Sequence, residues 1–119
     1  MKGKLITVVE TGVFTRRAEK LLTAEEREAL VDYLAENPEA GDEIEGTGGV
    51  RKLRYAARGK GKSGGVRVIY YYYTDEIPLF ALLVYGKNEQ ADLTPEQRKA
   101  VSVLAAAIKG RARARRERP

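Results

Sequence analysis

VRVIYYYYT, residues 66–74, has the strongest strand pattern in this sequence, because β-branched and aromatic residues fill most of its positions. Such residues favour extended backbone, in which successive side chains point to opposite faces of a sheet. After a turn at residues 75–78, LFALLVY at 79–85 is almost continuously apolar, which is typical of a strand in the middle of a sheet. The sequence therefore predicts two adjacent strands, 66–74 and 79–85.

Two more strands are predicted on the N-terminal side of this pair. VRKLRY at 50–55 is predicted as a strand, in which Lys52 and Arg54 should share one face and Leu53 should lie on the other. A glycine-rich loop at 58–65 would join this strand to the next as a hairpin. LITVV at 5–9 is short and β-branched, and it predicts the first strand of the chain.

Three helices are predicted from their start signals and apolar spacing. The first covers 14–22, and the second covers 24–36 after a capping box formed by Thr23 and Glu26. The third begins at a similar signal and covers 94–108. The predicted order is β-αα-βββ-α, which is an α+β fold with a small, mainly antiparallel sheet and helices packed on one face.

Length and composition narrow the possible functions. The 119 residues suit one domain, which we expect at 1–109, followed by a basic, disordered tail at 110–119. No apolar run is long enough for a membrane span, and the one after the N-terminus is too short for a signal peptide, so we expect a cytoplasmic protein. The chain has no His and no Cys, which excludes imidazole bases, thiol nucleophiles and sulfur-based zinc sites. We expect no cofactor and no metal.

Positive charge is concentrated in the middle of the chain. The formal net charge is +5, and residues 109–119 alone account for it. Residues 46–74 contain basic but no acidic side chains, whereas most of the acids come before residue 46. The basic side chains in question are Arg51, Lys52, Arg54, Arg58, Lys60, Lys62 and Arg67. Such a segment is either a surface for a polyanion or a solvated hairpin without a partner.

Basic and aromatic side chains are expected to converge where the last three strands lie side by side. Lys52 and Arg54 share one face, and Arg67 opens the next strand. Tyr85 and Lys87 lie two residues apart at the end of the last strand. Together they could bind a phosphodiester and stabilise the dianion formed when a ribose 2′-hydroxyl attacks the adjacent phosphate. Neighbouring cations lower the pKa of a lysine, which would let RNA be cut without histidine.

The tyrosines at 70–73 alternate across their strand, so two should face the helices and two the open face of the sheet. A core role explains the first pair, and on the open face Tyr71 could stack on an unpaired base. Further candidate RNA contacts are polar residues around the patch: Arg51, Arg58, Lys60, Lys62 and Asn88.

Three segments, GGVRKLR at 48–54, GKGKSGGVRVIYYY at 59–72 and VYGKNE at 84–89, resemble the RelE superfamily of toxins from bacterial toxin–antitoxin modules, in particular its HigB-like branch. The resemblance covers about residues 1–108. It implies a ribosome-dependent endoribonuclease that cuts mRNA in the decoding A site and is held inactive by a cognate antitoxin. The implied partners are therefore the antitoxin, the ribosome and mRNA, with no membrane.

The resemblance also assigns roles to residues. Lys52 and Arg54 match the basic pair of the family, Arg67 matches an arginine that contacts the transition state, and Lys87 matches a basic residue at the end of the last strand. Asn88 stands where the best-known members have an arginine. Thr94 stands where they have a ring, so Tyr85 could supply the stacking ring instead.

Two other functions stay open at this stage. A ParE-like relative would share the fold but act on DNA gyrase, and a catalytically silent relative would only bind a partner protein. The basic residues on matching strand faces favour the nuclease, because a gyrase binder does not need a cationic catalytic patch.

Overall fold

The structure, a computed structural model, describes residues 5–57 and 65–117 of the chain. Within these residues the centre is a mixed five-stranded sheet of order β1-β5-β4-β3-β2. Its strands are β1 (Val8–Glu10), β2 (Asp42–Glu43), β3 (Val50–Tyr55), β4 (Val66–Tyr71) and β5 (Leu79–Gly86). β1 pairs with β5 in parallel and the remaining pairs are antiparallel, so the predicted α+β class and the order of the predicted elements are confirmed.

Two helices, α1 (Gly12–Leu21) and α2 (Ala24–Glu36), cover one face of the sheet. The predicted capping box is present in α2, where Thr23 and Glu26 each bond the backbone N–H of the other. The core under these helices includes Phe14, Leu30, Leu34, Val68 and Tyr70.

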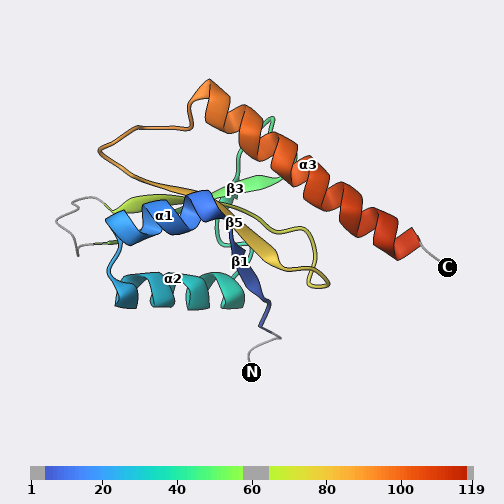
Figure 1. The fold of residues 1–119 in the computed structure, drawn as a ribbon, viewed down its shortest axis with the longest axis horizontal. Coiled ribbons are helices and arrows are strands. Elements are labelled where there is room, and N and C mark those ends of the chain that lie inside the picture. Colours follow the sequence, from blue (N-terminus) through green and yellow to red (C-terminus); the bar gives the residue numbers. More distant parts are fainter. Residues whose placement is uncertain (1–4, 58–64, 118–119) are drawn as a thin grey trace.

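The third helix, α3 (Pro95–Glu117), lies on the opposite face, whereas we expected all helices on one face. Figure 1 shows α3 sloping from the top of the view down to its right side and α2 at the lower left, with strands between them. Val101 and Ala105 of α3 pack against Ile69 and Leu83 of the sheet. The reason is that β4 carries apolar side chains on both faces, and an apolar sheet face must be covered.

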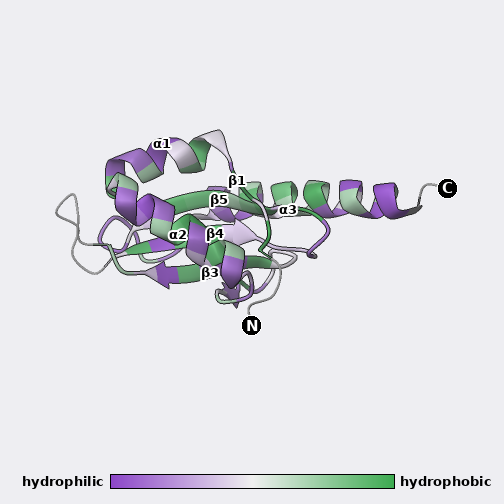
Figure 2. Cartoon of the chain, turned by 90° about the horizontal axis from the view of Figure 1, so that it is seen from below, coloured by the Kyte–Doolittle hydropathy of each residue, from purple (hydrophilic) through white to green (hydrophobic). Residues whose placement is uncertain are grey.

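Residues 110–117, which we expected to belong to a disordered tail, continue α3. Figures 1 and 2 show these last turns extending past the sheet. Alanine and arginine both favour helix, and Ala112 is buried, so the segment has local and tertiary support. Arg116 also pairs with Glu76 at 3.6 Å. None of the described helices is long and apolar enough to cross a membrane.

Strand ends differ from those predicted. β1 begins at Val8 rather than at residue 5, because it pairs only with the first residues of β5. β4 ends at Tyr71, before the turn. The connector at 41–49 contains β2, which the sequence did not predict and which pairs with Arg51 and Lys52 of β3.

Candidate active site

Three basic side chains lie on the α3 side of the sheet, near the end of the β3–β4 ladder. Arg54 of β3 is directly opposite Arg67 of β4, and Arg67 is opposite Tyr85 of β5. Lys52 is opposite Ile69, whose side chain belongs to the core under α3. The alternation of side chains puts Lys52, Arg54 and Arg67 on this one face. We call these three residues the cationic row.

The cationic row holds like charges close together. Arg54 and Arg67 face each other across paired strands, and like charges in directly opposed positions destabilise a sheet. Arg67 Nη1 donates to the carbonyl of Val66 at 3.3 Å, and Lys52 Nζ pairs with Asp92 Oδ1 at 3.1 Å. Arg54 is exposed. Such an arrangement favours an anionic ligand with several oxygen acceptors, as a phosphate has.

Tyr85 cannot be the stacking ring that we expected, because its side chain is fully buried (0% exposed). Burial raises the pKa of its hydroxyl, Asp92 raises it further, and Arg67 lowers it. The hydroxyl is buried without a hydrogen-bond partner among the described residues. Tyr85 is therefore part of the core under α3, next to Arg67 on the neighbouring strand, and its ring is not available to stack on a base.

Lys87 and Asn88 lie in an exposed turn directly after β5. The backbone N–H of Lys87 donates to the carbonyl of Gly65 at 3.1 Å, which holds the turn beside the start of β4. Arg67 follows Gly65 by two residues, so the turn lies next to the cationic row. The structure therefore brings Lys87 and Asn88 near the other predicted site residues.

Arg17 of α1 and Glu89 stabilise this turn. The sequence did not indicate this role for either residue. Arg17 Nε donates to the carbonyl of Val84 at 2.7 Å, and Nη2 pairs with Glu89 Oε1 at 2.8 Å. The same oxygen accepts from the backbone N–H of Gly86 at 2.6 Å. The contact joins residues 72 positions apart, so no local pattern could have indicated it.

Arg51, which we expected to contact RNA, lies outside the cationic row. It alternates with Lys52, so its side chain leaves β3 on the other face. Its guanidinium donates to the carbonyls of Gly41 at 2.7 Å and Glu39 at 3.2 Å, and it pairs with Glu43 at 3.5 Å. Arg51 thus fixes the segment before and within β2, away from the cationic row.

Tyr71 is also not available as a stacking surface, because only 2% of it is exposed. Its ring stacks on Tyr73 with centroids 6.5 Å apart, and Lys109 of α3 lies 5.7 Å from the centre of the Tyr73 ring. The face that we expected to be open is therefore covered by α3. The remaining predicted RNA contacts, Arg58, Lys60 and Lys62, lie outside the described residues.

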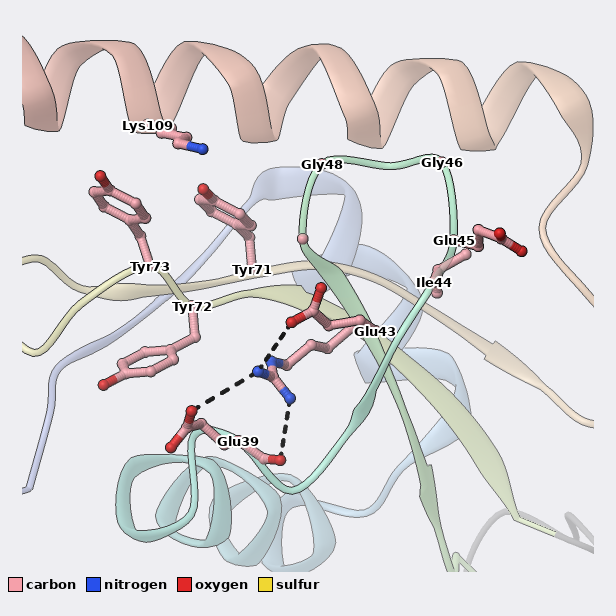
Figure 3. A pocket seen from close by; sticks show the side chains of 12 residues that line it. Glu39, Glu43, Ile44, Glu45, Gly46, Gly48, Tyr71, Tyr72, Tyr73 and Lys109 are labelled. Carbon is pink, nitrogen blue, oxygen red and sulfur yellow. Dashed lines mark hydrogen bonds and ion pairs between the residues drawn. The ribbon is translucent and has the colours of Figure 1, made fainter.

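A cavity of about 560 Å³ lies at the opposite end of the β3–β4 ladder from the cationic row. Figure 3 shows Tyr71 and Tyr73 side by side below Lys109, with Glu39 and Glu43 on the other side of the cavity. These two carboxylates are engaged by Arg51. The cavity is lined by three glutamates and by Arg51 and Lys109, so its opposite charges largely offset each other. The cationic row has three cations together, and we place the candidate active site there.

Comparison with known proteins defines the class of the chain as the toxin of a toxin–antitoxin pair. A family model described as the RelE toxin of the RelE/RelB toxin–antitoxin system matches residues 7–117. The chain belongs to the RelE toxin family, and an antitoxin is its implied partner. The structure of a mutant of E. coli toxin RelE in the free state is similar, with a TM-score of 0.54 and 17% sequence identity. The match covers 83% of this chain and 95% of that chain, and it confirms the fold.

Proposed function

We propose that this toxin is a ribosome-dependent endoribonuclease that cleaves mRNA in the decoding A site. The main support for this proposal is the cationic row, in which Arg54 is directly opposite Arg67 and Lys52 lies on the same face. Opposed arginines destabilise a sheet unless an anion lies between or above them. A phosphodiester of mRNA would provide that anion. Because the toxin would act on the ribosome, we also propose that it works in the cytoplasm.

The proposed reaction needs no metal and no cofactor. The ribose 2′-oxygen attacks the adjacent phosphorus, its proton leaves, and the bond from phosphorus to the 5′-oxygen breaks. A 2′,3′-cyclic phosphate forms, and the departing 5′-oxygen takes up a proton. The arginines of the cationic row would stabilise the dianionic transition state, since fixed donors aimed at developing charge are among the strongest catalytic contributions. Lys52 and Lys87 would transfer the protons, because the chain has no histidine.

Mapping of new mRNA ends after induction of the toxin in cells tests this proposal. New 5′ ends phased to codons are expected, because cleavage in the A site follows the reading frame. Unphased ends would indicate a free ribonuclease. Growth arrest without new ends would favour a gyrase inhibitor, and no arrest would favour a silent binding module.

A matched pair of variants ties the result to the site. Arg67→Ala removes a member of the cationic row, whereas Arg16→Ala removes an exposed arginine of α1. New ends should disappear in the first variant and persist in the second. Equal cleavage by both would contradict the assignment of the site.

A further inference from the structure

One member of the cationic row, Lys52, is paired with a carboxylate of the protein itself. Asp92, in the segment between β5 and α3, places its Oδ1 3.1 Å from Lys52 Nζ, within hydrogen-bond range. The two residues are 40 positions apart, so the tertiary fold brings them together. The carboxylate lies at the atom that we expect to meet a substrate phosphate.

The segment around Asp92 is held in place from both sides. Gln90 Nε2 donates to the carbonyl of Asp92 and to Gln97 Oε1, each at 2.8 Å. Gln97 in turn exchanges hydrogen bonds with Thr94 at the start of α3. Leu93 packs on the core beneath α3. These contacts fix the backbone around Asp92, and so they hold its carboxylate next to Lys52.

A second feature of the same place is the hydroxyl of Tyr85. It is buried and has no hydrogen-bond partner among the described residues, although Arg67 and Asp92 both lie close enough to shift its pKa. Buried polar groups normally have a partner, and exceptions often mark functional sites.

We propose that Asp92 occupies in the free toxin the place that a phosphate of mRNA takes at Lys52, and that binding of the substrate displaces it. This inference rests on the proposed nuclease function. Carboxylate and phosphate are both anionic acceptors, and two anions at one ammonium group repel each other. The built-in carboxylate therefore competes with any loosely held phosphate and favours RNA that the ribosome presents in the correct position.

The solvent exposure of Asp92 and Lys52 determines how much their ion pair can change the affinity for RNA. The side chain of Asp92 is 72% exposed and that of Lys52 is 30% exposed, so water and salt screen their attraction. Exposed ion pairs are weak enough that their loss changes an affinity about twofold to fivefold. An ion pair of this strength lowers the occupancy of weakly bound RNA, and it is still displaced by RNA that binds strongly.

The test compares Asp92→Asn with Asp32→Asn, an equal change of charge at an exposed residue of α2, on the other side of the sheet. Both are measured for binding to ribosomes programmed with an mRNA whose A-site codon carries 2′-O-methyl groups, which prevent cleavage. We expect Asp92→Asn to bind about twofold to fivefold tighter than Asp32→Asn. In a Lys52→Met background this difference should vanish, because the carboxylate then has no ammonium group to block.

Equal affinity of the two variants, or weaker binding by Asp92→Asn, would overturn the inference and leave the nuclease proposal intact. Codon-phased cleavage by the wild type is the separate test of that proposal, and its absence would remove the basis of both. Acylation of Lys52 in the free protein gives an independent check. It should be faster in Asp92→Asn than in Asp32→Asn, and equal rates would show that no such ion pair exists.

Discussion

Arg17 of α1 and Glu89 of the turn after β5 form an ion pair of 2.8 Å that links the helical layer to the end of the sheet where Lys87 lies. Glu89 Oε1 also accepts from the backbone N–H of Gly86, the residue before Lys87. The placement of a predicted site residue on one side of the sheet therefore depends on a helix from the other side.

Arg17→Ala should lower both stability and the rate of cleavage. It removes the ion pair and the hydrogen bond to Val84, and their combined loss should reduce the free energy of unfolding by about 1 kcal/mol. Cleavage should fall because the turn that carries Lys87 loses its support. Urea unfolding and cleavage on ribosomes measure the two effects, with Arg16→Ala as the control. A normal rate in Arg17→Ala would show that the turn is positioned without this contact.

Arg67→Ala should abolish toxicity without harming the fold. Removal of one donor aimed at developing charge typically lowers a rate about a hundredfold or more. The same change relieves the repulsion from Arg54, so the free energy of unfolding should stay equal or rise by about 0.2–1 kcal/mol. Growth assays and thermal unfolding test the two statements. A folded variant that arrests growth like the wild type would remove Arg67 from the site.

Tyr70→Phe should destabilise the protein through one lost hydroxyl. The Tyr70 hydroxyl is buried and accepts a hydrogen bond from the backbone N–H of Gly41 at 2.8 Å. Without it the amide is left unpaired in the core, which costs about 1–3 kcal/mol. Urea unfolding measures the loss, and Tyr33→Phe at an exposed position is the control. Equal stability of both variants would mean that the amide finds another acceptor.

The arginines at the end of α3 should add affinity for the ribosome without taking part in cleavage. Replacing Arg111, Arg113 and Arg115 by Gln keeps the helix but removes charges that could contact rRNA phosphates. Binding should weaken at moderate salt, and its dependence on salt concentration should become shallower. Identical binding curves before and after substitution would show that these charges make no contact with rRNA.

The antitoxin should dock on the acidic side of the toxin, away from the cationic row. The α2 helix has several exposed acidic side chains, including Glu25, Glu28 and Asp32. A basic antitoxin surface would associate with them at a rate that falls with salt. Amine-reactive labelling of the complex tests the docking face through Lys52, Lys60, Lys62 and Lys87. Strong protection of all four would show that the antitoxin covers the site directly.

The sequence alone determined the order and type of the main elements, because their signals are local. β-branched and aromatic residues indicated β4, and Leu53 between Lys52 and Arg54 indicated β3. The capping residues Thr23 and Glu26 indicated the start of α2. It also indicated the cationic row, since Lys52 and Arg54 share a face in any regular strand. The short β2 was missed because a strand of only two residues has no periodicity to detect.

Only the tertiary structure decided which face of the sheet α3 covers. That choice determined which of the predicted site residues are buried and which lie near the surface. Alternation assigns Tyr71 and Tyr85 each to one face of its own strand, but it does not show whether those faces are covered. Once α3 packed there, both rings were buried, whereas Lys52 and Arg54 stayed near the surface. The contacts of Arg17 and Asp92 join distant positions. Such contacts depend on how the layers pack, and this information lies in no single stretch of the chain.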